Sequence, residues 1–230
     1  MYGDPTKPRI VVGAHYDVCD SEIGNPAEGV PGADDNASGV SGMLELARLV
    51  QENKIDLSSH SIEFVAYTLE EPPYFRTEQM GSYIHAADLK NKNIEVKFMV
   101  SLEMIGYFSD AVNSQKYPFS FPMSQIFGDQ ANFIAIIGGP LEFLTLNRVQ
   151  GLFQKESTLP IYKLSAPAFV QGTDWSDHVN YTKFGYSAIM LTDTSFLRNS
   201  NYHQSTDTID TINFEKMADV VLGMRNVLKN

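Results

Sequence analysis

The sequence contains a single cysteine, Cys19, in 230 residues. One thiol cannot form a disulfide within the chain. The lack of such a disulfide leaves the redox compartment open, because many secreted enzymes of this size have none. No apolar run approaches the roughly 20 residues that cross a membrane, so we expect no membrane span. The first residues, MYGDP, do not resemble a signal peptide. The first strand pattern already begins by Arg9, as in a trimmed or mature chain; if a leader has been removed, we expect a soluble protein that is secreted or periplasmic.

Basic residues are also scarce: 17 Lys and Arg stand against 28 Asp and Glu, which gives a net charge of −11. Nucleic acids and anionic membranes bind clustered Lys and Arg, so neither is expected as a partner. An acidic chain suits metal cations or cationic substrates, and it also simply confers solubility. Hydrophobic residues make up 43% and charged residues 20% of the chain, as in ordinary soluble globular proteins.

The chain shows no internal repeat, low-complexity tract or linker, and its length suits one domain over residues 1–230. Strands are predicted at residues 9–17, 60–69, 94–102, 132–137, 159–164 and 187–191. Helices are predicted at residues 37–53, 79–90, 141–155, 178–185 and 214–228. This alternation predicts an α/β fold with a mixed, mostly parallel sheet and helices on both faces. Residues 107–130 have few such cues, and their aromatic content favours an ordered flap or pocket wall.

Two adjacent carboxylates, Asp34 and Asp35, lie in the turn PGADDNASG at residues 31–39, directly before an amphipathic helix. The plain interpretation is a helix cap on a surface loop, because Asp, Asn and Ser are favoured at that position. The alternative is a ligand site, because open α/β sheets bind ligands beyond the carboxyl ends of their strands.

Other acidic and histidine side chains favour the second interpretation, because each lies at the carboxyl end of a predicted strand or beyond it: His15, Asp17, Glu70, Glu71, Glu103 and His203. The carboxyl ends of parallel strands share one edge of a sheet, so these side chains should converge there. Carboxylates that meet in a partly buried pocket repel one another, which raises their pKa values, and a divalent cation removes that cost. Two histidines and several carboxylates suit zinc, or else manganese or cobalt.

Five motifs in this chain are HYD at 15–17, PGADDNASG at 31–39, EE at 70–71, LEMIG at 102–106, and YH at 202–203 with DT at 207–208. Together and in this order they resemble the co-catalytic zinc exopeptidases of the aminopeptidase Y family. Glutaminyl cyclases and the glutamate carboxypeptidase/transferrin-receptor-like proteins share that fold. Each motif alone is weak evidence, whereas five in register are specific. The resemblance runs from about Ile10 to the last helix and implies a zinc exopeptidase catalytic domain over residues 1–230, with an N-terminal segment missing if the chain has been trimmed.

The resemblance implies a role for each matching ligand residue. His15 binds one zinc, Asp35 bridges two, and Glu71 and His203 bind the second. Glu103 stands where the family more usually has Asp, as the carboxylate on the His15 metal. Glu is one methylene longer than Asp, which moves the carboxylate outward. The number of zinc ions per chain therefore stays open between two and one.

The resemblance also implies roles around the metals. Glu70 is the general base, Asp17 orients His15, and the peptide bond after Asp35 is cis. Candidates for the pocket and for substrate contact are Tyr107, Asp177, His178 and Tyr202.

The function expected from these residues is a zinc-dependent aminopeptidase that hydrolyses N-terminal residues from peptide substrates. A single-zinc glutaminyl-peptide cyclotransferase and a non-catalytic domain of the same fold are the alternatives. A carboxypeptidase-type dipeptidase would need an arginine for the substrate carboxylate, and Arg76, Arg148 and Arg198 are candidates. The sequence leaves side-chain preference and oligomeric state open.

Overall fold

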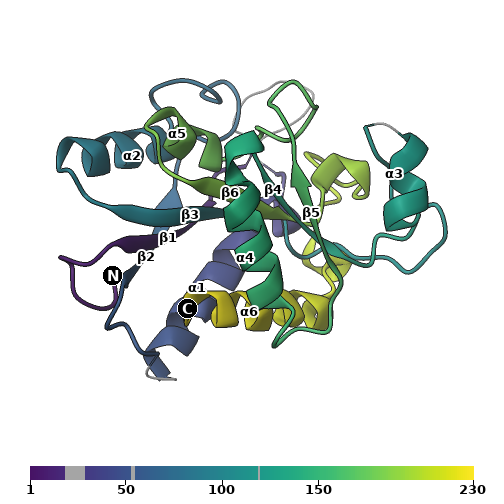
Figure 1. Cartoon of the computed structure of the whole chain (residues 1–230). Coiled ribbons are helices and arrows are strands. Elements are labelled where there is room, and N and C mark those ends of the chain that lie inside the picture. Colours follow the sequence, from purple (N-terminus) through teal and green to yellow (C-terminus); the bar gives the residue numbers. More distant parts are fainter. Residues whose placement is uncertain (19–28, 53–54, 119) are drawn as a thin grey trace.

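The computed structural model describes residues 1–18, 29–52, 55–118 and 120–230; Cys19, Asn53 and most of the loop before the Asp34-Asp35 turn lie outside them. The described residues form a six-stranded sheet of order β2-β1-β3-β6-β4-β5 (Figure 1). Its strands are β1 Arg9–His15, β2 Ser61–Tyr67, β3 Val96–Glu103, β4 Ile134–Gly138, β5 Ile161–Ser165 and β6 Ala188–Thr192.

Four neighbouring strands, β2, β1, β3 and β6, are parallel to one another. The strand β4 pairs antiparallel with β6, and β5 runs parallel to β4. The sheet is therefore mixed and mostly parallel, as predicted. The carboxyl ends of the four parallel strands lie along one edge, which is the arrangement that brings the predicted ligands together.

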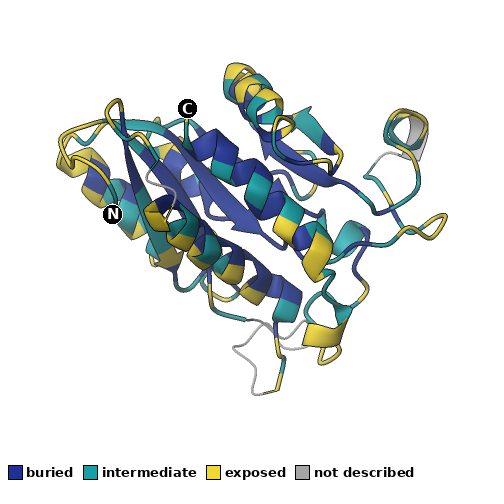
Figure 2. Cartoon of the chain, turned by 90° about the horizontal axis from the view of Figure 1, so that it is seen from below, coloured by how far each residue is buried: buried dark blue, intermediate teal, exposed yellow. Residues whose placement is uncertain are grey.

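Helices cover both faces of the sheet, which confirms the predicted layers (Figure 1). One face carries α1 Gly39–Glu52, α4 Phe143–Phe153 and α6 Phe214–Leu228, which pack together over the main hydrophobic core. The other face carries α2 Gly81–Asn91 and α5 His178–Lys183 over a smaller core. In Figure 2 the sheet is buried between these layers, as expected for strands with apolar side chains on both faces.

The local sequence explains most of these elements. In α1, residues Met43, Leu46 and Val50 are buried along one face while Leu44 is exposed, which is the amphipathic pattern of a helix that covers a sheet. Gly13 on β1 is required by packing, because a Cβ there would lie 2.2 Å from the ring of Tyr67. The predicted closing helix has the bounds of α6, and the other predicted elements shift by a few residues at their ends.

One helix was not predicted. The segment 107–130 contains α3, Ser120–Phe127, in addition to extended loop. Pro122 lies in its first turn, where a helix needs no hydrogen bond from the backbone nitrogen, so this proline does not oppose helix formation. Short helical turns complete the chain at η1 Ala33–Ser38, η2 Pro140–Glu142, η3 Ser195–Leu197 and η4 Ile209–Thr211. None of the described helices has the length and apolar character that a membrane crossing requires.

Candidate metal centre

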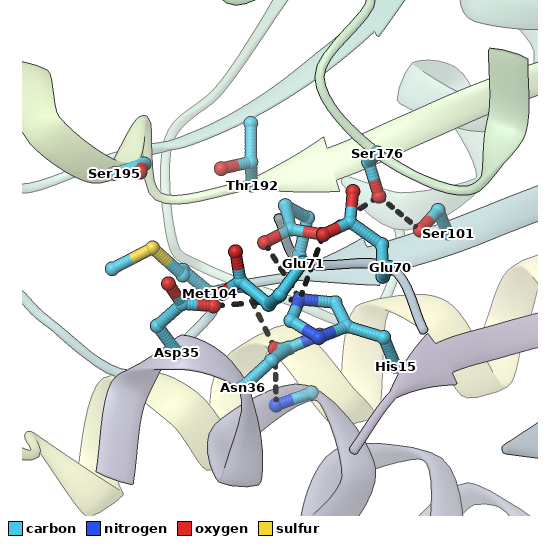
Figure 3. Close-up of polar contacts among 12 residues, drawn as sticks. His15, Asp35, Asn36, Glu70, Glu71, Ser101, Met104, Ser176, Thr192 and Ser195 are labelled. Atoms are coloured by element: carbon cyan, nitrogen blue, oxygen red, sulfur yellow. Dashed lines mark hydrogen bonds and ion pairs between the residues drawn. The ribbon is translucent and has the colours of Figure 1, made fainter. Parts of the chain in front are cut away.

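The predicted ligand residues converge at the carboxyl edge of the parallel strands. Figure 3 shows His15, Asp35 and Glu71 there, together with Glu70. His15 is the last residue of β1 and Glu103 the last residue of β3. Glu71 follows β2, and His203 lies in the loop after β6. Asp35 lies in η1, whose backbone departs from helical angles at this residue. Residues that are far apart in the chain thus meet because four parallel strands end side by side.

The side chains form three overlapping groups, two of which share Asp35 and are called here the half-sites; the third joins His15 to Glu70 and Glu71. In the first half-site, Nε2 of His15 lies 3.4 Å from Oδ1 of Asp35 and 3.3 Å from Oε1 of Glu103. In the second half-site, Nε2 of His203 lies 3.1 Å from Oδ2 of Asp35 and 3.1 Å from Oε1 of Glu71. Within each half-site the ligand atoms lie within 4.8 Å of one another. The two oxygens of Asp35 therefore face different histidines.

These residues fit a pair of zinc ions. Asp35 is 4% exposed, and among the described residues none donates a hydrogen bond of normal geometry to its carboxylate oxygens. A buried carboxylate without donors is costly, and a cation beside each oxygen would satisfy it. Each half-site offers one imidazole nitrogen and carboxylate oxygens, which are ligand types that zinc accepts. The peptide bond between Asp35 and Asn36 is cis, as the resemblance implied.

The electrostatics of the metal-free site are those of crowded charges. Burial raises the pKa of Glu70 well above its usual value, and the charges of Glu103 and Glu71 add to this rise. Burial and the charge of Asp35 raise the pKa of Glu71 to about 7. These shifts agree with the repulsion that the sequence predicts. Protons take the place of cations at these groups when no metal is bound.

Asp35 departs from this expectation. Burial would raise its pKa, but its close contacts with the imidazoles of His15 and His203 outweigh burial and lower it. For His203 burial acts in the opposite direction and would lower the pKa. Its contacts with Asp35 and Glu71 outweigh burial and raise that pKa to about 10. The raised pKa expected of uncompensated carboxylates does not apply to Asp35, because this carboxylate lies between two imidazoles.

Asp17 supports the site in two ways. Nδ1 of His15 lies 3.1 Å from the backbone carbonyl oxygen of Asp17 and 3.7 Å from its Oδ1. The other carboxylate oxygen accepts a hydrogen bond of 3.0 Å from the backbone N–H of Glu71. Asp17 thus contacts the imidazole mainly through its carbonyl, and its carboxylate holds the backbone of a residue in the second half-site.

Glu103 is held by a residue that the sequence analysis missed. Its Oε2 accepts a hydrogen bond of 2.7 Å from the hydroxyl of Ser176, and this hydroxyl lies 2.6 Å from that of Ser101 (Figure 3). One oxygen of the longer Glu side chain therefore faces His15 while the other is fixed by Ser176. The sequence around Ser176 gives no signal of this contact, because nothing local to it shows that it packs against β3.

Of the predicted substrate-contact residues, only Tyr202 lines the cavity over the metal centre. Its ring stacks on that of His203 with centroids 3.7 Å apart. The backbone N–H of Tyr107 instead donates to Oδ2 of Asp193, at 2.9 Å. Asp177 and His178 are buried, and neither lines this cavity or the second cavity described below.

Two connected cavities adjoin the centre. The metal cavity, of about 320 Å³, is lined by Asp35, Glu70, Glu71, Pro72, Phe75, Glu103, Trp175, Tyr202 and His203. A second one, of about 90 Å³ and called here the apolar depression, shares Glu103, Trp175 and Tyr202 with it. Its lining includes the apolar side chains of Phe133, Ala135, Ile137, Leu164 and Met190 from β4, β5, β6 and the residue before β4.

The candidate arginines for a substrate carboxylate lie elsewhere, and none of them lines either cavity. Arg76 pairs with Asp174 at 2.5 Å. Arg148 donates to the carbonyl of Asn230. Arg198 is buried, and its guanidinium donates to the backbone carbonyl of Phe133 at 2.9 Å. The requirement of a carboxypeptidase-type site is therefore not met by these three residues.

Comparison with known proteins agrees with this geometry. The chain is 43% identical over 229 residues to YfbL of Escherichia coli strain K12, a match that covers 100% of this chain and 69% of YfbL. It is 25% identical over 226 residues to leucine aminopeptidase 1 of Paracoccidioides brasiliensis strain Pb03, covering 95% of this chain and 52% of that protein. The chain thus spans about half the length of this fungal relative.

Solved structures show the same fold. The crystal structure of LapB from Legionella pneumophila matches with a TM-score of 0.69 at 28% identity, over 96% of this chain and 51% of that one. A glutaminyl cyclase from Bacteroides thetaiotaomicron matches with a TM-score of 0.69 at 20% identity, over 100% of this chain and 75% of that one, which shows the fold alone. The model of peptidase family M28 matches residues 1–228, so nearly the whole chain carries the family's pattern, and the protein belongs to peptidase family M28.

Proposed function

We propose that the protein is a zinc-dependent aminopeptidase that hydrolyses the N-terminal residue of peptides. The observation that supports this most is the pair of half-sites joined by Asp35, because each histidine faces a different oxygen of one buried carboxylate. His15 and Glu103 would hold one zinc, His203 and Glu71 the other, and Asp35 both. When bound, zinc supplies Lewis acidity, which polarises a carbonyl group and makes a water molecule acidic.

Glu70 is the group that moves the proton. Its carboxylate lines the metal cavity, and its Oε2 lies 4.0 Å from Nε2 of His15. Burial raises its pKa well above the usual value, so its carboxylate is a stronger base than that of an exposed glutamate. Glu70 therefore accepts the proton of the attacking water and passes it to the leaving amine.

The two cavities account for exopeptidase selectivity. Among the described residues, no Lys or Arg lines the metal cavity, so no positive side chain there repels a free, positively charged α-amino group. The apolar depression begins at Glu103, Trp175 and Tyr202, where the side chain of the N-terminal residue can leave the metal cavity. Its apolar lining favours hydrophobic side chains, which lose their contact with water on binding.

The proposal is tested with aminoacyl anilides, their N-acetylated counterparts and a peptide with N-terminal glutamine. We expect hydrolysis of leucyl and other apolar anilides, with two zinc ions per chain, and no hydrolysis of the acetylated forms. Release of ammonia from the glutamine peptide by a protein with one zinc would instead support the cyclotransferase. Binding of zinc with no turnover of any substrate would support a non-catalytic domain.

A substitution of the base tests the mechanism. Glu70→Gln should lower kcat by about 10²–10⁴-fold, because this is the usual contribution of a general base, while zinc remains bound. Glu78→Gln is a matched control, because the carboxylate of Glu78 accepts a hydrogen bond from the exposed hydroxyl of Tyr83 and lines neither cavity. Unchanged kcat in Glu70→Gln would contradict the assigned role.

A further inference from the structure

Asp207 is a buried carboxylate outside both half-sites and both cavities. It lies on the same loop as His203, a few residues further along the chain. Its Oδ1 accepts a hydrogen bond of 3.0 Å from the backbone N–H of Asp34, and its Oδ2 accepts one of 3.0 Å from that of Asp35. Its backbone carbonyl also accepts from the N–H of Ala33, at 3.0 Å. The loop that carries His203 is therefore tied to three successive backbone amides of η1.

The opposite side of the same turn is tied to the strand that carries Glu103. The amide of Asn36 donates to the carbonyl of Leu102 at 2.8 Å, and its oxygen accepts from the N–H of Met104 at 3.0 Å (Figure 3). Asp35 thus lies between two anchors, one on the first half-site's strand and one on the second half-site's loop.

The backbone anchors matter because the side chain of Asp35 has none of its own. Neither of its oxygens accepts a hydrogen bond of normal geometry from a described residue, so its direction depends on where the backbone places its Cα and on the metals. Residues that hold metal ligands in orientation typically change metal affinity about 10–100-fold when substituted. An aspartate suits this position, because a carboxylate accepts hydrogen bonds with both oxygens and donates none.

We propose that Asp207 is a positioning residue: by holding the backbone N–H groups of Asp34 and Asp35, it directs the Asp35 carboxylate toward both histidines and thereby joins the two half-sites. This inference rests on the proposed function only in that both half-sites bind metal. Asp207 touches neither substrate nor metal, and it acts through Asp35.

The test measures zinc affinity by competition with a chelator, together with unfolding of the metal-free protein. Asp207→Asn keeps the size of the side chain but turns one acceptor into a donor that faces a backbone N–H. We expect this variant to bind zinc about 10–100-fold more weakly than the wild type. Asp210→Asn is the matched control, because that exposed carboxylate bonds the hydroxyl of Thr208, and it should leave zinc affinity unchanged. Unchanged zinc affinity in Asp207→Asn would overturn the proposal, whatever its effect on unfolding.

A double-mutant cycle shows whether Asp207 acts through Asp35. In an Asp35→Asn background, Asp207→Asn should cause little further loss of zinc affinity, because the group it positions is already altered. An equal loss in both backgrounds would overturn the assignment. If Asp207→Asn does not fold, Asp207→Ser, which keeps one short acceptor, is measured in the same way. Because the readout is zinc binding, a wild type that binds two zinc ions without cleaving peptides would refute the proposed function and leave this inference standing.

Discussion

The crowding of carboxylates predicts that the metal-free protein loses stability as pH rises, through Glu71 in particular. Burial and the charge of Asp35 raise its pKa from 4.5 to about 7 in the folded protein. The folded state therefore holds this proton more tightly than the unfolded state does. The resulting stabilisation is fully present below pH 4.5 and is lost as pH rises through about 7.

The magnitude follows from the same values. A change of pKa from 4.5 to about 7 corresponds to about 3 kcal/mol of unfolding free energy between the two ends of this range. Other groups also make the unfolding free energy depend on pH. Burial lowers the pKa of His178 to about 4, so the contribution of His178 to stability rises with pH. Glu71→Gln removes this carboxylate together with its effect on the pKa of His203, while the pH dependence contributed by distant groups is common to both proteins.

The assay is urea unfolding of both metal-free proteins from pH 4.5 to 8. The stability of the wild type relative to Glu71→Gln should fall by about 3 kcal/mol over this range. Saturating zinc should reverse the trend in the wild type, because zinc binds the ionised carboxylate and its affinity rises with pH. A difference between the metal-free proteins that does not change with pH would refute the assigned burial and repulsion of Glu71.

Three further substitutions test other parts of the structure. Ser176→Ala should weaken zinc binding about 10–100-fold in a chelator competition, because it removes the hydrogen bond that fixes Glu103; unchanged affinity would contradict that role. Ala135→Phe, in the floor of the apolar depression, should lower kcat/KM for leucyl anilides far more than for alanyl anilides, and an equal effect on both would place the substrate side chain elsewhere. Phe153→Ala removes a fully buried ring and should cost about 3–5 kcal/mol in urea unfolding, while the number of bound zinc ions stays the same.

The sequence by itself determined the α/β class, the positions of the ligands at strand ends and the family. These depend on local patterns: a buried apolar run such as β1 predicts a strand, and the amphipathic repeat of residues 214–228 predicts α6 with its observed bounds. The convergence of His15, Asp35 and His203 was also predictable, because parallel strands end at one edge.

Only the tertiary structure decided how these residues are supported and charged. The hydroxyl of Ser176 reaches Glu103 across 73 residues of chain, and Asp207 reaches the backbone of Asp35 across 172. The lowered pKa of Asp35, the position of Arg198 away from the cavities, and the antiparallel β4 likewise have no local signature. Each depends on distances between segments that are remote in sequence, and the topology of the sheet sets those distances.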